Sequence, residues 1–259
     1  MRHVTIVSKI RSLLRFTCNI CNSPCSVETL DREIPSCKKC GSNVRFRWIV
    51  HALSTELFGR SLPLKEFPRN RKIRGISLSD WDRTANVLAK RFDYKNTFFH
   101  REPRLDIMNP KSGIDGSYDF VVASEVLEHV PPPVQAAFDN LARLLKPGGF
   151  VVFSSPWASE GDTEEHFPDL FDWQVVKFRS DYVLLNRTKD GRLETFENLI
   201  FHNGPGDTLE IRVFSIDGLL ANCQAAGFDV ALAEDNPAYG IVWDDWSRGI
   251  VLRKIKSNG

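Results

Sequence analysis

The sequence predicts an α/β fold, in which a mostly parallel sheet carries helices on both faces and a small cysteine-rich module precedes it. Three observations lead to this prediction. From residue 72 onward, strand-like and helix-like segments alternate. Hydrophobic residues make up 42% of the 259 residues, enough for a buried core. Five of the six cysteines fall within 23 residues, between Cys18 and Cys40.

The cysteine-rich module has the spacing of a structural zinc ribbon. One CxxC pair is formed by Cys18 and Cys21, a second by Cys37 and Cys40, and fifteen residues separate the two. Two tight turns would then present four thiolates to one Zn²⁺, which would hold structure because no coordination position stays open. Turn-forming residues, such as Gly41 directly after the second pair, support this interpretation.

The two remaining cysteines have other expected roles. Cys25 is either an alternative zinc ligand or a spare thiol, whereas Cys223 lies in an apolar helical setting and is expected in the core. Apolar spacing predicts a helix over residues 44–58, followed by a proline-containing basic connector. We therefore expect a zinc module with its helix over residues 1–60 and a second domain over 61–259.

The alternation in the second domain predicts six strands and three helices. The Lys146-Pro147-Gly148-Gly149 turn ends the middle helix, and the prolines from Pro132 set its first turn. Strands are expected at 72–76, 97–100, 118–123, 150–154, 229–233 and 249–254, and helices at 80–91, 132–145 and 216–226.

Residues 116–157 carry three motifs at a characteristic spacing. They are Tyr118-Asp119-Phe120 at a strand start, Glu125-Val126-Leu127-Glu128-His129 after the strand, and the Leu145-Lys146-Pro147-Gly148-Gly149 turn. Together they resemble the fourth and fifth strands of a class I S-adenosylmethionine-dependent methyltransferase of the type 11-like group. The resemblance implies a Rossmann-like sheet of seven strands and S-adenosylmethionine as methyl donor.

The resemblance also implies a donor-binding turn after the first strand. The family's turn is rich in glycine, but this chain has Gly75 followed by Ser77, Ser79 and Asp80. Serine is small enough for close approach of the donor, although a positive φ costs it more than glycine. We expect Ser79 or Asp80 to cap the following helix, and the alternative is a capped turn without a donor.

Four further residues are candidate donor contacts by the same resemblance. Glu102 is expected to bind the ribose hydroxyls and Asp106 the adenine amino group, while Ser124 and Glu125 line the pocket at the end of the fourth strand. Glu102 and Asp106 are only four residues apart, whereas the family commonly inserts a helix there. Either the connection is shortened, or one of the two carboxylates only forms surface pairs.

Residues 155–214 are an insertion between the fifth strand and the last crossover. An Asp190-Gly191 turn between alternating runs predicts a hairpin, which we interpret as a lid over the acceptor. Transfer of a methyl group to a hydroxyl requires a base, and His166 and His202 are the leading candidates, with Glu165 after them. Loop packing is the alternative role for each histidine.

Three other residues are candidate contacts around the acceptor. His129 is expected to shape the site, or else to be a hydrogen-bonded structural group. Arg212 could bind an anionic group of the acceptor or form a salt bridge within the lid, and Trp157 could stack on the acceptor or pack in the core.

Charge and hydropathy restrict the function classes. The net charge is +1, but residues 1–74 carry +10 and the remainder −9, which suits a front half that meets an anionic partner or the other half of the chain. No apolar run is long enough to span a membrane and no secretory signal is apparent, so a cytoplasmic protein is expected.

Three functions remain open. The first is O-methylation of a small molecule, or of a glycan or nucleotide-linked acceptor. The second is methylation of an RNA base, because a zinc ribbon before a methyltransferase domain resembles the bacterial ribosomal RNA guanine-N1 methyltransferases. The third is a binding module that has lost activity, suggested by the serines in the donor turn. The sequence leaves the acceptor and the oligomeric state undetermined.

Overall fold

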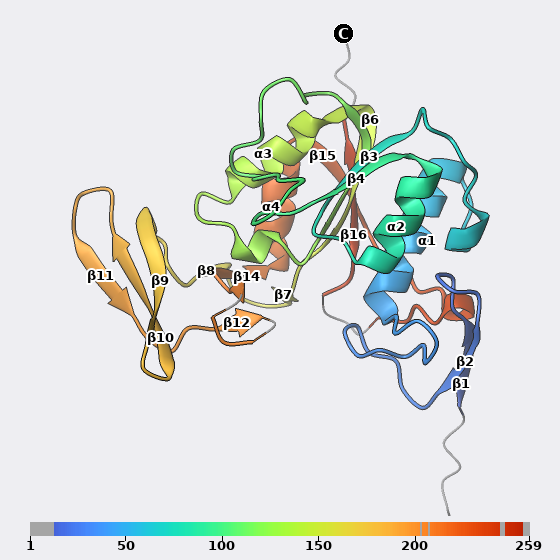
Figure 1. Cartoon of the computed structure of the whole chain (residues 1–259), viewed down its shortest axis with the longest axis horizontal. Helices are drawn as coiled ribbons and strands as arrows, with labels where there is room; N and C mark the ends of the chain where they lie inside the picture. The colour runs from blue at the N-terminus through green and yellow to red at the C-terminus, as the bar shows by residue number, and fades with distance from the viewer. Residues whose placement is uncertain (1–12, 203, 207, 244–246, 256–259) are drawn as a thin grey trace, which may run out of the picture. The chain divides into compact units, whose positions relative to one another are not determined.

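The computed structural model describes residues 13–255 except 203, 207 and 244–246 (Figure 1). The described residues form two compact units. The cysteine unit contains the chain up to Phe67 together with Glu234–Asp244, and the sheet unit contains Pro68–Ala233 and the chain from residue 245 onward. No helix among the described residues is both long enough and apolar enough to cross a membrane.

The cysteine unit is built on one hairpin and one helix. β1 (Leu14–Thr17) pairs antiparallel with β2 (Pro24–Val27), and α1 spans Val44–Phe58, the range predicted from the sequence. α1 begins where the Asn43 side chain accepts a hydrogen bond from the Phe46 amide, and it ends at Gly59 with a left-handed φ of 68°. Short 3-10 turns, η1 (Leu64–Glu66) and η3 (Pro237–Tyr239), complete the unit.

A distant segment of the chain completes the core of the cysteine unit. Between β15 and β16 the chain leaves the sheet unit, and residues 234–243 contact α1 and β1. Arg47 donates to the Gly240 carbonyl at 2.8 Å, and the rings of Trp48 and Trp243 meet edge to face at 5.7 Å. Gly240 is required here, because a Cβ atom would lie 2.6 Å from the Phe16 ring.

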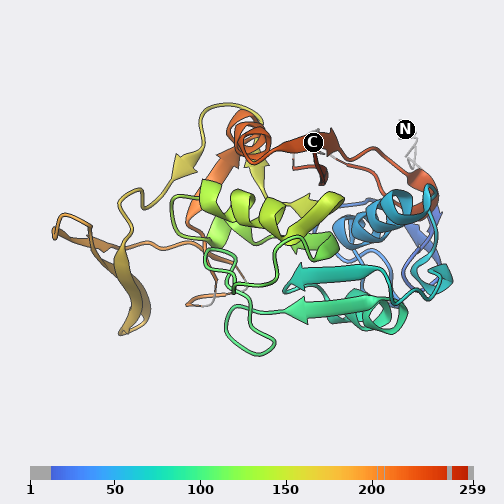
Figure 2. The ribbon, with the colours of Figure 1, turned by 90° about the horizontal axis from the view of Figure 1, so that it is seen from above.

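The sheet unit contains a six-stranded mixed sheet in the order β15-β16-β6-β5-β3-β4 (Figure 2). The strands β3 to β6 run parallel, β16 is antiparallel to β6, and β15 is antiparallel to β16. Their bounds are Arg74–Leu78 (β3), Asp93–Thr97 (β4), Tyr118–Ser124 (β5), Leu145–Ser154 (β6), Phe228–Leu232 (β15) and Ile250–Lys254 (β16).

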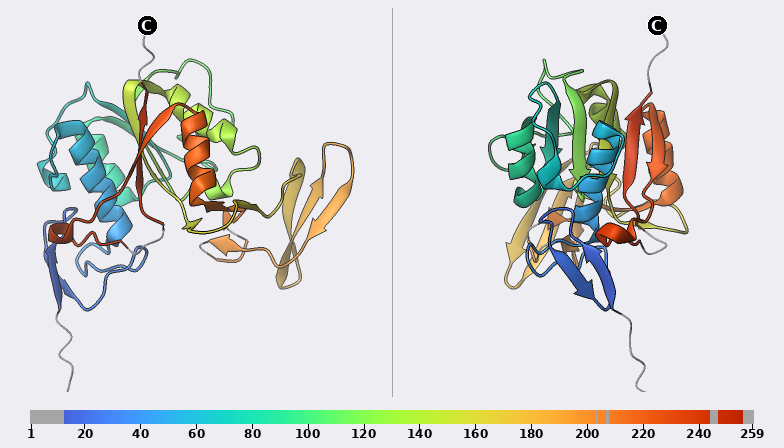
Figure 3. Two further views of the ribbon diagram at one scale, coloured as in Figure 1. Left: turned by 180° about the vertical axis from the view of Figure 1, so that it is seen from behind. Right: turned by 90° about the vertical axis from the view of Figure 1, so that its right-hand side faces the viewer.

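Helices cover both faces of this sheet, as predicted. α2 (Asp82–Arg91) connects β3 to β4 and α3 (Gln135–Leu144) connects β5 to β6, in opposite directions across the sheet. Right-handed crossovers therefore place α2 and α3 on opposite faces. α4 (Ile216–Ala225) contacts β15, the strand that follows it, as the view from behind in Figure 3 shows.

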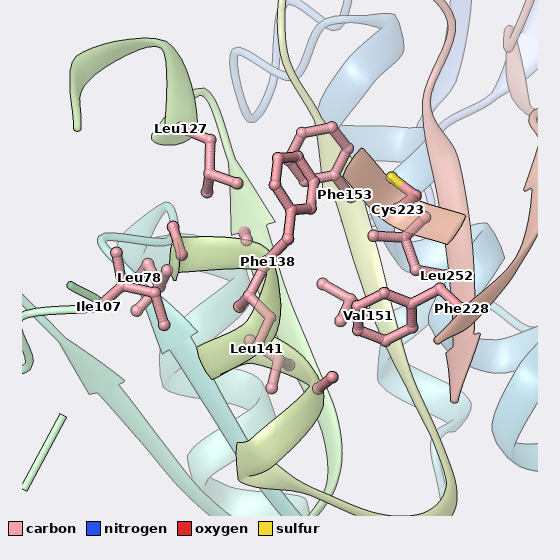
Figure 4. Close-up of a cluster of buried hydrophobic side chains, with 14 of the residues drawn as sticks. Leu78, Ile107, Leu127, Phe138, Leu141, Val151, Phe153, Cys223, Phe228 and Leu252 are labelled. Atoms are coloured by element: carbon pink, nitrogen blue, oxygen red, sulfur yellow. The ribbon is translucent and has the colours of Figure 1, made fainter. Parts of the chain in front are cut away.

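The main core lies between α3, α4 and one face of the sheet (Figure 4). Alternate strand residues such as Val151 and Phe153 point toward Phe138 and Leu141 of α3, and all four are fully or almost fully buried. Cys223 of α4 lies in the same core, as predicted. On the opposite face of the sheet, Phe120 of β5 stacks on Tyr94 and Phe150. Both faces of the sheet are therefore apolar.

The chain reverses direction across the sheet between β3 and β5. β4 lies on one side of β3, and the next strand in the sequence, β5, lies on the other. In open parallel sheets, ligands bind in the crevice that this reversal creates at the carboxyl ends of the strands. The residues directly after β3 and β5 are therefore the first place to look for a site.

The resemblance implied a central sheet of seven strands, but among the described residues the central sheet has six. The connection 98–117, all of which the structure describes, contains only a single bridge between Phe98 and Arg104. Two prolines and two glycines within these 20 residues disfavour regular structure, and the connection is too short for a further strand with its helices. The expected strand at 97–100 is also wrong, because β4 ends at Thr97.

Residues 155–214 form a set of short strands around the predicted hairpin. β10 and β11 pair antiparallel around the Asp190-Gly191 turn, and β9 pairs with the other edge of β10. A separate small core contains Phe167, Leu184 and Ile211. The bounds are Trp157–Ala158 (β7), Glu164–Glu165 (β8), Asp172–Phe178 (β9), Asp181–Arg187 (β10), Leu193–Phe196 (β11), Phe201–His202 (β12), Thr208–Leu209 (β13) and Arg212–Ser215 (β14).

Candidate active site

Two non-glycine residues adopt left-handed backbone conformations at the carboxyl ends of the central strands. Ser79 follows β3 with a φ of 58°, and Glu125 follows β5 with a φ of 55°. The Ser79 amide donates to the Thr97 carbonyl at 2.7 Å and the Glu125 amide to the Ser154 carbonyl at 2.8 Å. Such conformations cost roughly 1–3 kcal/mol each and gather at functional sites. The positive φ anticipated for a serine in this turn is therefore present at Ser79.

Two of the expected donor contacts instead tie β3 to β4. The buried Ser77 hydroxyl donates to Asn96 Oδ1 and accepts from the Tyr94 hydroxyl, both at 2.7 Å. Asp80 Oδ2 accepts from the same Tyr94 hydroxyl at 3.1 Å. Burial, reinforced by the Asp80 charge, raises the pKa of Tyr94 well above its ordinary value, so this phenol stays protonated. The network fixes the shape of the turn that Ser79 completes.

The helix cap expected of Ser79 or Asp80 is wrong. The N-cap of α2 is Trp81, without a side-chain cap, while Asp80 Oδ1 accepts from the Trp81 amide at 2.7 Å. Gly75 lies inside β3, where a Cβ atom would stand 2.2 Å from the ring of Phe120. The absence of a side chain at Gly75 is thus required for packing within the sheet unit.

The two acidic residues of the shortened connection bind their own loop. Glu102 is exposed and accepts from the Arg104 amide at 2.9 Å. Asp106 is half-buried and accepts from the Met108 amide at 2.9 Å. Because β4 ends at Thr97, Glu102 lies five residues beyond the strand end at which a ribose contact was expected. Of the two alternatives, the shortened connection is the one that the structure has.

The ends of β5 and β6 are joined by side chains that were expected to line the donor pocket. The hydroxyl oxygens of Ser124 and Ser154 are 2.8 Å apart, and the Ser154 hydroxyl lies 2.8 Å from Glu125 Oε1 as a donor. Ser124 and Glu125 therefore lie together at the reversal point. Ser154 joins them, and its position at a strand end is the signal in the sequence that could have identified it.

Three predicted histidines gather around one carboxylate. Glu210 Oε2 lies 2.9 Å from His202 Nε2, and Glu210 Oε1 lies 3.0 Å from His166 Nε2. The rings of His129 and His202 meet edge to face with centroids 4.6 Å apart. We call His129, His166, His202 and Glu210 the histidine cluster. Sequence reasoning assigned no role to Glu210, since nothing in its spacing marks it as the shared partner.

Backbone contacts bring the two halves of the histidine cluster together. The 3-10 turn η2 (Leu127–His129) begins two residues after Glu125, at the end of β5. His129 Nδ1 donates to the Leu209 carbonyl at 2.8 Å, and the Ile211 amide donates to the Glu128 carbonyl at 2.9 Å. β12 and β13 pair His202 with Thr208. The cluster thus follows directly on the strand that ends at the reversal point.

The environment keeps His129 neutral. Burial lowers the pKa of His129, an effect that the nearby His202 increases and that the Leu209 carbonyl partly opposes. At neutral pH its imidazole therefore retains a nitrogen lone pair, because Nδ1 carries the proton that is donated to Leu209.

Glu128 extends the cluster with a buried carboxylate. Its side chain is 1% exposed, Oε2 accepts from the Ser155 hydroxyl at 2.9 Å, and Oε1 lies 3.7 Å from His129 Nε2. One oxygen of Glu128 and one nitrogen each of His129 and His202 all lie within 4.8 Å of one another. This set of ligand atoms can hold a metal ion.

The buried Arg212 forms an ion pair with the half-buried Glu165. Arg212 is fully buried, its Nε lies 2.6 Å from Glu165 Oε1, and its Nη1 donates to the Leu127 carbonyl at 2.5 Å. The salt bridge, one of the two alternatives for Arg212, is therefore formed, and it engages Glu165 as well. Trp157 is a core residue at 7% exposure, as its alternative role required.

The four predicted zinc ligands converge in the cysteine unit. The Sγ atoms of Cys18 and Cys40 are 3.6 Å apart, as are those of Cys21 and Cys37, and all four lie within 4.8 Å. A tetrahedral site with Zn–S bonds of about 2.3 Å needs sulfurs about 3.8 Å apart. The residues present therefore fit a zinc ion.

Two tight turns of the same form present these thiols. The Asn22 amide donates to the Cys18 carbonyl at 2.8 Å, and the Gly41 amide donates to the Cys37 carbonyl at 2.7 Å. Asn22 and Gly41 both have a positive φ. Burial alone would raise the pKa of Cys37, but hydrogen bonds from the Cys40 amide and from neighbouring groups lower it to about 6. A thiolate is therefore available without metal.

Cys25 lies outside this set of four. Its thiol contacts the Ser23 carbonyl at 3.6 Å, and burial, with the neighbouring Cys37, raises its pKa to about 12. Cys25 therefore stays protonated, as expected of a spare thiol rather than of a ligand.

Comparison with known proteins finds a family model that matches most of the sheet unit. Residues 63–233 match a family model described as a methyltransferase domain. A ubiquinone biosynthesis O-methyltransferase of Burkholderia vietnamiensis is 52% identical over 40 residues, which are 15% of this chain and 17% of that protein. The match thus spans about a sixth of the length of the curated relative.

Solved structures of methyltransferases are similar at low identity. The 1,6-didemethyltoxoflavin N1-methyltransferase of Burkholderia thailandensis is 14% identical, with a TM-score of 0.44 over 80% of this chain and 77% of that one. The sugar N-methyltransferase KedS8 from Streptoalloteichus is 13% identical, with a TM-score of 0.45 over 81% of this chain and 86% of that one.

Proposed function

The chain belongs to the methyltransferase-domain family, and we propose that it transfers a methyl group from S-adenosylmethionine to a hydroxyl group of a small molecule or sugar. One observation carries the choice of a hydroxyl acceptor. The turn η2 begins two residues after Glu125 and ends at His129 of the histidine cluster, so groups that can remove a proton follow the strand end where we expect the donor to bind.

The donor is proposed to bind at the carboxyl ends of β3 and β5, where the chain reverses direction across the sheet. When bound, S-adenosylmethionine would supply a methyl group attached to a sulfonium. The acceptor bonds to the methyl carbon as the carbon–sulfur bond breaks, and S-adenosylhomocysteine leaves. Ser79 and Glu125 provide the strained backbone positions that flank the crevice, while Ser77 and Asp80 hold the turn rigid. Ser124 stands at the same edge and is the candidate polar contact for the donor.

The histidine cluster supports activation of an oxygen acceptor. An alcohol must lose its proton as it attacks, whereas an amine with a free lone pair needs less help. His202 is the leading base, because Glu210 orients its ring and His129 lies against it. His166 shares Glu210 and serves as a second candidate. The short match to a ubiquinone biosynthesis O-methyltransferase also supports an oxygen acceptor.

The cysteine unit is proposed to hold one structural zinc ion. Four thiols at tetrahedral separation leave no open coordination position, so Cys18, Cys21, Cys37 and Cys40 would supply stability rather than chemistry. The buried Arg47 guanidinium, which donates to the Ser42 carbonyl at 2.9 Å, supplies positive charge beside these thiols.

Calorimetry and methyl transfer test this function together. Full-length protein should bind S-adenosylmethionine, and His202→Ala should leave that binding unchanged while lowering turnover by roughly 10²–10⁴-fold, the usual contribution of general base catalysis. The assay uses labelled methyl donor with catechols, sugars and an RNA oligonucleotide as acceptors. His100→Ala, at an exposed histidine of the same unit, is the matched control and should retain full activity.

Three outcomes would contradict the proposal. Absence of donor binding would leave only a binding module without activity. Methylation of RNA, with no small molecule accepted, would favour the alternative suggested by the basic first 74 residues. Full activity of His202→Ala would remove His202 as the base.

A further inference from the structure

Glu128, His129 and His202 meet from two distant parts of the chain. Glu128 and His129 belong to η2, and His202 belongs to β12. One potential ligand atom from each lies within 4.8 Å of the other two. Ligand atoms around a first-row metal ion stand roughly 3 to 4 Å apart, given bonds of about 2.1 Å. Side-chain adjustments of less than an ångström would therefore bring all three into coordination distance.

In each of the two histidines one ring nitrogen is held by an acceptor, so the lone pair is on the other nitrogen. The Leu209 carbonyl can only accept, so His129 Nδ1 carries the proton and Nε2 the lone pair. Glu210 holds His202 Nε2 at 2.9 Å, and an ionised carboxylate likewise accepts, which leaves the lone pair on Nδ1. A carbonyl or carboxylate behind each imidazole is the usual arrangement around metal-binding histidines.

Glu128 brings a carboxylate oxygen to the same point. Its Oε1 lies 3.7 Å from His129 Nε2, and its side chain is 1% exposed. A carboxylate oxygen and an imidazole nitrogen at this separation are both suitable ligands for one metal ion. The Ser155 hydroxyl orients the second oxygen at 2.9 Å.

We propose that Glu128, His129 and His202 bind one divalent first-row transition-metal ion of the class of Mn²⁺, Fe²⁺ or Zn²⁺. Two imidazole nitrogens and one carboxylate oxygen favour these ions over Ca²⁺ or Mg²⁺, which prefer oxygen ligands alone. This inference rests on the proposed function and specifies how its site works. A bound ion would lower the pKa of a coordinated hydroxyl; His202 would then be a ligand, and His166, the second candidate base, would accept the proton of the acceptor.

Manganese binding tests this site separately from catalysis. Electron paramagnetic resonance of the full-length protein, prepared with one zinc ion per chain and titrated with Mn²⁺, should show one saturable site per chain, because the four thiolates retain that single softer zinc ion. The double variant His129→Ala/His202→Ala should lose at least 100-fold in Mn²⁺ affinity. His100→Ala should bind Mn²⁺ as the wild type does, since His100 is exposed in the same unit.

A measurement on the wild-type protein guards against misfolding of the variant. Electron spin echo spectra of bound Mn²⁺ should contain the modulation of directly coordinated imidazole nitrogen. Absence of saturable Mn²⁺ binding, absence of that modulation, or unchanged affinity in the double variant would each overturn the metal site. The proposed function would survive these results, with His202 as base, whereas it fails if the wild type does not bind S-adenosylmethionine.

Discussion

The cysteine cluster and the Glu128–His129–His202 centre are both able to hold a metal, but they are assembled in opposite ways. The four cysteines come from 23 consecutive residues and from two turns whose own backbone hydrogen bonds set the geometry. Glu128 and His202 are 74 positions apart, and their contact depends on β12, β13 and the loop after β5. The first site is local, and the second exists only once the sheet unit has folded.

The two centres also differ in the chemistry of their ligands. Thiolates are soft ligands, and four of them close the coordination shell, which suits a structural role. A carboxylate with two imidazoles leaves coordination positions for an acceptor, which suits chemistry. The local site can therefore form from a short stretch of chain, whereas the long-range site needs a scaffold that is already folded.

The largest effect is expected from the local site. Cys37→Ser should reduce the zinc content from about one per chain to near zero and unfold the cysteine unit, because structural zinc contributes roughly 10–16 kcal/mol in small zinc modules. Metal analysis and circular dichroism measure both effects. Cys25→Ser is the matched control and should keep its zinc, since Cys25 lies outside the set of four thiols and its own thiol contacts the Ser23 carbonyl. Zinc retained by Cys37→Ser would refute a four-thiolate site.

A smaller effect is expected from Arg212, which holds the turn η2 of the long-range centre in place. Arg212 joins the Glu165 carboxylate to the Leu127 carbonyl, beside η2. Arg212→Met should lower the free energy of unfolding of the sheet unit by about 1–3 kcal/mol, because the half-buried Glu165 carboxylate and the Leu127 carbonyl both lose their hydrogen-bond donor. Urea denaturation measures this change, and zinc content should stay constant.

A double variant separates charge from packing in that ion pair. Arg212→Met with Glu165→Met should recover most of the lost stability, since two apolar side chains replace the partly buried pair at little cost. A double variant as unstable as Arg212→Met alone would show that the pair acts through shape and not through charge.

The smallest effect concerns Cys223, a thiol that never becomes a ligand. Burial raises its pKa to about 12 from an ordinary value of 9.0. Below pH 9 its contribution to stability is fully present, and it is lost as the pH rises toward 12, because the unfolded chain releases the proton first. Between pH 9 and 10.5 the wild type should lose about 1.1 kcal/mol per pH unit more than Cys223→Ala, approaching the limiting value of about 1.4 kcal/mol per unit as the unfolded thiol becomes fully ionised. If the free energy of unfolding, measured by urea denaturation at each pH, fell equally steeply with pH in both proteins, the buried protonated thiol would be contradicted.

The local features of the molecule could be predicted from the sequence because short-range patterns determine them. The limits of α1 follow from Asn43 and Gly59, and the hairpin of residues 181–196 follows from its Asp190-Gly191 turn. The parallel order of β3, β5 and β6 follows from the alternation of strands and helices together with three family motifs.

What depends on tertiary contacts was not predictable. Asn96 binds both Ser77 and Asp80, yet in the sequence it is an ordinary polar residue within a strand. Glu210 joins two histidines that lie 36 positions apart in the chain, and no periodicity reports such a contact. Strand β4 was misplaced because Phe98 and Phe99 look like strand residues, although Phe99 is 52% exposed.

The excursion of the chain between β15 and β16 has a practical consequence for truncation experiments. Ile241 and Trp243 are buried by residues of the first 67 positions, although they are encoded close to the carboxyl terminus. A shortened gene that begins at residue 68 would leave these two apolar side chains uncovered, so insolubility of its product would say nothing about whether the sheet unit folds alone. Replacing 234–244 by a short glycine-rich loop in the same gene would make that test fair.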